Sequence, residues 1–250
     1  MLFNIIASGS KGNATIIKGK KTVILIDMGI SFSRLKEGCE EINVTPEMID
    51  GALFTHEHSD HINGLRFIPV KKQYSLEGTL PSQGHNEVSL FNPFIIGEFV
   101  ITPILTSHDA KNPCGFVIEQ DKEKLVYFTD TGMFPEINYH FVKNPDYLII
   151  ESNHDIPMLL KTKRTAELKA RIMSDIGHLC NEDSALIAKD IVGNKTKEII
   201  LAHISEEANT PDLAVKAYQK MFANFGLDIE KYHLRVANQW YSTIGGHYED

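Results

Sequence analysis

The sequence lacks several features that would place it in a membrane or outside the cell. It contains no apolar run long enough to span a bilayer, and its opening Met-Leu-Phe-Asn lacks the basic start of a signal peptide. The three cysteines, Cys39, Cys114 and Cys180, are scattered and odd in number, which predicts reduced thiols rather than a disulfide framework. No tandem repeat, low-complexity tract or linker is evident, so we expect a single domain over residues 1–250 in the cytoplasm.

The sequence also has fewer basic than acidic residues. The chain carries 25 lysines and arginines against 33 aspartates and glutamates, which gives a net charge of −8. This balance disfavours a broad nucleic-acid-binding face, whose footprint is usually basic, but bound divalent cations would add positive charge that the count omits. Basic residues still cluster at 18–21 and at 161–164. We interpret the first cluster as a solvated turn, whereas the second follows a candidate catalytic segment.

The densest group of ligand-type side chains lies at 55–61, Thr-His-Glu-His-Ser-Asp-His, directly after an apolar segment that predicts a buried strand. Imidazole and carboxylate groups suit Zn²⁺, Mn²⁺ or Fe²⁺. His56 and His58 are two residues apart, so in extended backbone they point the same way and can bind one ion. Asp60 and His61, at an expected helix start, can bind a second. A surface loop with chance histidines is the alternative, but four such side chains in six positions favour a two-metal site.

Further acidic and imidazole side chains recur where expected strands end. The sequence predicts strands at 2–7, 14–18, 22–26, 51–54, 99–105, 115–119, 125–129, 147–150, 199–202 and 234–237. Six of these are followed by a chemically active residue, in order Asp27, His56, His108, Asp130, Glu151 and His203. A packed core gives no reason for this placement, so we expect a site along one edge of a sheet. Asp27 is either a helix cap or an acceptor for a metal-bound histidine.

Helices are predicted at 31–39, 166–174, 182–192 and 210–225, with a further helix start at Thr45 and Pro46. Residues 71–93 have a weak pattern that predicts loop and short strands.

The spaced motif His-x-His-x-Asp-His at 56–61, followed in order by His108, Asp130 and His203, resembles the metallo-β-lactamase family over nearly the whole chain. The resemblance implies an α/β fold, an αββα sandwich of two mixed sheets flanked by helices. It also implies two divalent ions, Zn²⁺ or Mn²⁺, and a metal-dependent phosphodiesterase. The implied ligands are His56, His58 and His108 for the first ion and Asp60, His61 and His203 for the second, with Asp130 bridging both.

Within the phosphodiesterase branch, four segments are similar to the YycJ (WalJ) group of bacterial 5′-to-3′ exonuclease-like proteins: 9–14, 107–110, 151–155 and 177–183. RNase Z carries a related arrangement, whose Glu and His are matched here by Glu151 and His178. The segment 71–93 looks shorter than in typical YycJ proteins, which bears on the substrate. Relatives commonly pair, so we expect a homodimer, in the cytoplasm of a bacterium or of an infected host cell if the chain is phage-encoded.

The candidate catalytic and substrate-binding residues have the following expected roles. Asp60, as a ligand, would also orient the attacking water, and His178 would protonate the leaving oxygen with Glu151 orienting or protonating its imidazole. A helix cap is the alternative role for His178. His154 is an alternative donor or a phosphate contact. Ser10 and Asn13 would donate hydrogen bonds to phosphate, unless their segment is an ordinary turn. Four other histidines have no partner pattern and are read as surface or core residues: His85, His140, His233 and His247.

Two substrates compete within phosphodiester hydrolysis. A YycJ-like enzyme would degrade DNA from a 5′ end, and the motifs around Glu151 and His178 favour this reading. A 3′,5′-cyclic nucleotide phosphodiesterase that degrades cCMP or cUMP, like the related phage anti-Pycsar proteins, is favoured by the acidic charge and the short segment 71–93. A thioester or lactone hydrolase shares the metal motif but needs no such proton donor. A metal-stabilised scaffold would normally hold one closed ion, whereas seven ligand-type residues suggest two open ones.

Overall fold

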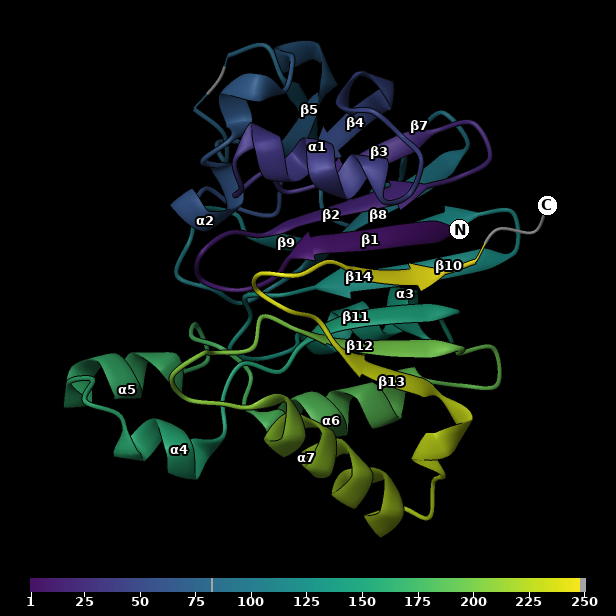
Figure 1. Cartoon of the computed structure of the whole chain (residues 1–250). Helices are drawn as coiled ribbons and strands as arrows, with labels where there is room; N and C mark the ends of the chain where they lie inside the picture. Colours follow the sequence, from purple (N-terminus) through teal and green to yellow (C-terminus); the bar gives the residue numbers. More distant parts are fainter. Residues whose placement is uncertain (82, 248–250) are drawn as a thin grey trace. The chain divides into compact units, whose positions relative to one another are not determined.

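The structure is a computed structural model that describes residues 1–81 and 83–247 (Figure 1). Its chain divides into two compact units. The first unit comprises Met1–Ile104, Ala110–Glu123 and Asn238–Asp250, and the second comprises Leu105–Asp109 and Lys124–Ala237. Within the described residues, no helix is both long and apolar enough to cross a bilayer.

The first unit contains a mixed sheet in the strand order β14-β1-β2-β3-β4-β5-β6. Its strands are β1 (Leu2–Ala7), β2 (Ala14–Lys18), β3 (Val23–Ile26), β4 (Ile49–Leu53), β5 (Gln73–Leu76), β6 (Asn86–Val88) and β14 (Thr243–Gly246). The pairs from β14 to β3 are antiparallel, and the pairs from β3 to β6 are parallel. All four residues of β3 are buried, as expected for a strand covered on both faces.

In the described part of the chain, two α-helices, three short 3₁₀-helices and three further strands complete the first unit. Helix α1 (Phe32–Glu40) begins at Ser31, whose hydroxyl accepts a hydrogen bond from the Arg34 amide, and it buries Leu35 and Cys39 in an apolar cluster with β1 to β4. The other elements are η1 (Pro46–Met48), α2 (Ser59–Ile62), η2 (Leu65–Phe67), η3 (Val70–Lys72), β7 (Phe94–Ile96), β8 (Phe99–Leu105) and β9 (Cys114–Gln120).

The second unit is built on four parallel strands in the order β13-β12-β11-β10. They are β10 (Glu123–Phe128), β11 (Tyr147–Glu151), β12 (Glu198–Ala202) and β13 (His233–Val236). Every residue of β11 is buried, which explains its continuous apolar run. Because the strands are parallel, their carboxyl ends meet at one edge of the sheet, where α/β proteins place their sites.

Helices of the second unit connect these strands. They are η4 (Glu136–Asn138), α3 (Tyr139–Val142), α4 (Ile156–Lys161), α5 (Ala166–Ile172), α6 (Asn181–Ile191), α7 (Pro211–Asn224) and η5 (Ile229–Lys231). Helices α6 and α7 lie side by side (Figure 1), with the Ser184 Oγ atom 2.6 Å from the Tyr218 hydroxyl. Thr210 begins α7 by accepting a hydrogen bond from the Leu213 amide.

The prediction of an α/β fold with two mixed sheets flanked by helices is confirmed. Thr45 is the N-cap and Pro46 the first residue of η1, so a helix starts where the sequence predicts one; it is a 3₁₀-helix of three residues, because β4 begins immediately after it. The weak segment 71–93 holds the short strands β5 and β6, as expected. Helices α3 and α4 and strands β7 and β14 were not predicted. The single domain over residues 1–250 stays a prediction.

Candidate metal centre

In the first unit, the motif at 55–61 follows β4 and runs into α2. His56 and His61 are buried, and His58 is partly exposed. The ring centroid of His56 lies 4.6 Å from that of His58 and 4.0 Å from that of His61. The three imidazoles therefore gather at one place, as the spacing of the motif predicts.

A buried carboxylate sets the orientation of this group. Asp27 Oδ2 accepts a hydrogen bond from His61 Nδ1 at 2.8 Å, and Asp27 Oδ1 accepts from the Thr55 amide at 2.9 Å. Burial raises the pKa of Asp27, and the contacts with His61 and Thr55 oppose that rise. Two roles were expected for Asp27, and the structure shows that it accepts a hydrogen bond from a histidine. It does not cap the following helix, because Ser31 does.

The Thr55 hydroxyl links the same group. It donates to Asp27 Oδ2 at 2.9 Å and lies 3.0 Å from His56 Nδ1. A hydroxyl has one hydrogen, so with that hydrogen on Asp27 its oxygen accepts from His56 Nδ1. Thr55 was not among the predicted site residues, although its place directly before His56 was a usable signal.

The turn at 8–13 packs against α2 through Asn13. Asn13 Oδ1 accepts from the Gly9 amide at 2.8 Å, and Asn13 Nδ2 lies 3.0 Å from His61 Nε2. The Asn13 amide donates to the Asp60 carbonyl at 2.7 Å. Asn13 is fully buried, whereas Ser10 in the same turn is exposed. As phosphate contacts, both residues stay predictions.

In the second unit, Asp130 follows β10, Glu151 ends β11 and His203 follows β12, so all three lie at the carboxyl edge of the parallel strands. Asp130 Oδ1 lies 3.5 Å from His203 Nε2, 3.8 Å from His178 Nδ1 and 3.9 Å from His108 Nε2. One carboxylate oxygen therefore faces three imidazoles. Ligand-type atoms of Asp130, Glu151, His178 and His203 all lie within 4.8 Å of one another, close enough for a metal site.

Both carboxylate oxygens of Glu151 accept hydrogen bonds, one from two imidazoles and the other from two backbone amides. Its Oε1 accepts from His178 Nδ1 at 2.8 Å and from His203 Nδ1 at 2.9 Å. Its Oε2 accepts from the amides of Thr131 at 2.9 Å and Leu179 at 3.2 Å. Burial alone would raise the pKa of the Glu151 carboxyl, but the two imidazoles hold it well below its usual value. An ionised acceptor of this kind orients the imidazoles and has no proton to give.

Two further histidines of this unit, His108 and His154, are buried. His108 Nδ1 donates to the Gly177 carbonyl at 3.1 Å, and burial lowers the pKa of His108 against the opposing effect of Asp130. Burial also lowers the pKa of His154, to about 4, which makes it neutral at pH 7.

Cys180 caps α6, so the alternative of His178 as its cap is wrong. Asn153, which was not predicted, donates to the His203 carbonyl at 2.9 Å.

Three of these strand-end residues have left-handed backbone: Asp27 with φ 58°, Asp130 with φ 55° and His203 with φ 55°. For residues other than glycine this conformation costs on the order of 1 kcal/mol, and it recurs at functional sites.

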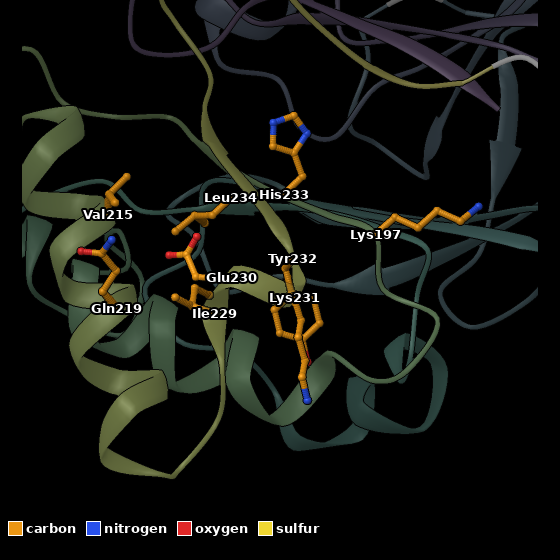
Figure 2. Close-up of a pocket in the computed structure, with 9 residues that line it drawn as sticks. All are labelled: Lys197, Val215, Gln219, Ile229, Glu230, Lys231, Tyr232, His233 and Leu234. Atoms are coloured by element: carbon orange, nitrogen blue, oxygen red, sulfur yellow. The ribbon is translucent and has the colours of Figure 1, made fainter.

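A cavity of about 590 Å³ lies elsewhere in the second unit, among α7, η5 and β13 (Figure 2). Gln219, Glu230, Tyr232 and His233 are among its lining residues, and none of the predicted site residues lines it. Figure 2 shows that the side chain of Lys197, the residue before β12, extends away from the other labelled residues.

The chain is similar to known proteins over most of its length. A family model described as a β-lactamase superfamily domain matches residues 22–204. The exodeoxyribonuclease WalJ of Streptococcus pneumoniae serotype 2 is 35% identical over 227 residues, 85% of this chain and 84% of that protein. The exodeoxyribonuclease YycJ of Bacillus anthracis is 31% identical over 240 residues, 91% of each chain.

Solved structures agree on the fold. The metallo-β-lactamase fold protein YhfI from Bacillus subtilis has a TM-score of 0.72 at 19% identity, covering 98% of this chain and 99% of that one. The resemblance predicted from the motifs at 56–61, 151–155 and 177–183 is thereby confirmed. Because the model match and both relatives span most of its length, this chain belongs to the β-lactamase superfamily and is a relative of the YycJ and WalJ proteins.

Proposed function

We propose that this protein is a dinuclear metal-dependent phosphodiesterase that hydrolyses DNA from a 5′ end. The relatives WalJ and YycJ bear the name exodeoxyribonuclease, which supports a nucleic acid as the substrate class. The observation that carries the proposal is the Glu151 carboxylate, which accepts from His178 Nδ1 at 2.8 Å beside Asp130 and His203. Such a pair orients a proton donor for a poor leaving group, which esters with good leaving groups do not need.

The donor set fits divalent ions. Four histidines have Nδ1 engaged by an acceptor: His56 by Thr55 Oγ1, His61 by Asp27, His108 by the Gly177 carbonyl and His203 by Glu151. These acceptors fix the tautomer that leaves Nε2 as the ligand atom. With His58, Asp60 and Asp130 they make the seven proposed ligands of two ions. A set of imidazoles and carboxylates accepts both Zn²⁺ and Mn²⁺.

The proposed chemistry divides among the chain's own residues. Bound divalent ions lower the pKa of water and stabilise negative charge on phosphate oxygens. Asp60 orients the attacking water. His178 donates the proton on its Nε2 atom to the leaving oxygen. The Glu151 carboxylate accepts a hydrogen bond from His178 Nδ1 and so orients the ring. Ser10, Asn13 and His154 remain the proposed substrate contacts, of which only Ser10 is exposed.

A 3′,5′-cyclic nucleotide phosphodiesterase acting on cCMP or cUMP is the second candidate. The net charge of −8 favours a small substrate over a long polyanion. The segment 71–93 supports the same alternative, since it holds only short elements: part of η3, with β5 and β6.

One experiment separates the two substrates. The protein, supplied with Mn²⁺ or Zn²⁺, is incubated with cCMP, cUMP, cAMP and 3′-end-labelled duplex DNA. We expect stepwise loss of DNA from the 5′ end and no loss of cyclic nucleotide. Hydrolysis of cyclic nucleotides without DNA cleavage would contradict the DNA proposal. Asp60→Asn is the control, because it keeps the side-chain size and should abolish either activity.

We also propose that the protein is a cytoplasmic homodimer. The support is family membership, since relatives in the superfamily commonly pair. Light scattering coupled to size-exclusion chromatography measures the mass directly; twice the chain mass of 28.1 kDa is expected, and a monomer would contradict the proposal.

A further inference from the structure

The segment between Glu151 and His178 forms a short helical hairpin, here called the α4–α5 hairpin (residues 156–177). Figure 1 shows α4 and α5 beside each other at one side of the second unit. The segment carries five basic and two acidic residues in a chain whose net charge is −8. The basic residues are Lys161, Lys163, Arg164, Lys169 and Arg171.

One of these basic side chains closes the hairpin, and a second joins it to the segment between β12 and α7. Lys169 Nζ donates to the carbonyls of Leu160 at 2.7 Å and Thr162 at 2.8 Å, which closes the carboxyl end of α4 onto α5. Arg164 Nε lies 3.0 Å from Glu207 Oε2. Beneath them, Leu159, Ile172 and Ala208 form a small apolar cluster. The hairpin is therefore closed on itself and packs against the segment between β12 and α7 through Ala208.

The other basic side chains face outward. Lys161 and Lys163 are exposed, and neither has an acidic partner among the residues that the structure describes. Arg171 is also exposed, with Nη2 2.6 Å from Asp109 Oδ2. Large apolar side chains are exposed on the same segment: Ile156, Leu160, Leu168, Met173 and Ile176. The exposed cations match the phosphates of a nucleic-acid strand, and the aliphatic side chains among them offer apolar contact to its sugars.

The hairpin leads directly into the candidate metal centre. The His178 amide donates to the Ile172 carbonyl at 2.9 Å, so the end of α5 fixes the backbone of His178. At the same turn, the Gly177 carbonyl accepts from His108 Nδ1. A Cβ atom on Gly177 would lie 2.2 Å from the carbonyl oxygens of Arg171 and Ile172, so the turn is packed too closely for a side chain. A strand lying on the hairpin would be held in register with His178.

We propose that the α4–α5 hairpin binds the phosphate backbone of a nucleic-acid strand whose end is hydrolysed at the candidate metal centre. The inference rests on the proposed function and names the part of the chain that recognises a polymer. Lys161 and Lys163 pair with phosphates, and the exposed apolar side chains contact sugars. The segment supplies local positive charge where the whole chain has little, which is why a net charge of −8 is compatible with DNA as substrate.

The test uses a charge-reversed double variant, Lys161→Glu with Lys163→Glu. The matched control is Lys216→Glu with Lys220→Glu, two exposed lysines on α7 in the same unit. Binding to a fluorescent, cleavage-resistant phosphorothioate single strand is measured by anisotropy over a range of salt concentrations. We expect the hairpin variant to bind at least about tenfold more weakly, with a salt slope smaller by about 1.4 for two lost single-strand contacts. Turnover of bis(p-nitrophenyl) phosphate should match wild type in both variants.

Three outcomes would overturn the inference. The first is that the hairpin variant and wild type bind DNA with equal affinity and equal salt slope. This would overturn the inference and leave the proposed function intact, because wild type would still cleave DNA. A variant that loses binding to anionic phosphatidylserine vesicles and keeps DNA binding would assign the hairpin to a membrane surface. A change of mass in solution without a change in DNA binding would assign it to a second copy of the chain. Failure of the proposed function is distinct, because wild type itself would then leave DNA intact.

Discussion

At the scale of single residues, buried carboxylates hold three histidines by their Nδ1 atoms. Asp27 holds His61, and Glu151 holds both His178 and His203. For His61 and His203 the acceptor fixes the ring orientation and the tautomer with the lone pair on Nε2, which in His61 lies 3.0 Å from Asn13 Nδ2. For His178 it fixes the ring orientation. The proposed metal centre therefore depends on two buried carboxylates that are not themselves proposed ligands.

Replacing Asp27 tests this dependence. Asp27→Asn keeps the shape but removes the charge that His61 Nδ1 donates to, so we expect metal affinity to fall about 10–100-fold with the fold retained. Competition with a chromophoric chelator measures the affinity, and circular dichroism checks the fold. Asp121→Asn, an exposed position on a turn, is the control. Unchanged affinity in Asp27→Asn would mean that the carboxylate does not support a metal ligand.

His178 can be tested through the leaving group. His178→Asn should lower kcat on DNA by about 10²–10⁴-fold, the usual contribution of general acid catalysis. Its effect on bis(p-nitrophenyl) phosphate should be much smaller, because p-nitrophenolate leaves without a proton. Equal losses on both substrates would show that His178 positions the centre and does not donate the proton.

The ligand-type residues were predictable for two reasons. Few other roles explain four such side chains in six positions at 56–61, and few explain why an acidic residue or a histidine follows so many of the predicted strands. The contacts that orient them were predictable only in part. That Glu151 Oε1 accepts from His203 as well as His178 depends on β11 and β12 being parallel neighbours, which the sequence does not state. Thr55 and Asn153 were missed, because a threonine and an asparagine have many uses.

At the scale of elements, the site residues lie where strands end. Asp27, Asp130 and His203 turn the chain out of β3, β10 and β12 with left-handed backbone. β1 and β2 were predicted with the bounds that the structure has, because a Gly-rich turn separates them and a second turn follows β2. β14 was missed because Thr-Ile-Gly-Gly has little strand propensity of its own and forms by pairing with β1. α4 was missed because it is short and contains Pro157.

Close backbone packing positions α2 against the β3 end. A Cβ atom on Gly29 would lie 1.6 Å from the Asp60 carbonyl oxygen, so Gly29→Ala must displace the motif loop. We expect a loss of about 3 kcal/mol in the free energy of unfolding, the upper end of the range for overpacking, measured by urea denaturation. Gly78→Ala, with no atom within 4 Å but φ of +70°, should cost only about 1 kcal/mol. Equal stability of the two variants would contradict the packing.

At the scale of the whole molecule, the chain combines a net charge of −8 with three buried free cysteines. Burial raises the pKa of Cys39 and of Cys180 to about 12, and burial also raises the pKa of Cys114. Their thiolate forms are scarce at neutral pH, and their sulfur atoms are covered.

The thiols should therefore be inert in the folded protein. We expect no reaction with Ellman's reagent at pH 8 on a timescale of minutes, and three equivalents after unfolding in guanidinium chloride. Rapid labelling of any one thiol in the native state would show that its surroundings open easily.

The two-ion centre is tested most directly by titrating metal-free protein with Zn²⁺ or Mn²⁺ while turnover of bis(p-nitrophenyl) phosphate is followed. Bound metal is counted by inductively coupled plasma mass spectrometry. We predict no turnover without metal and a rise that levels off at two ions per chain. Full turnover in the metal-free chain, or a plateau at a single ion, would contradict the proposed centre.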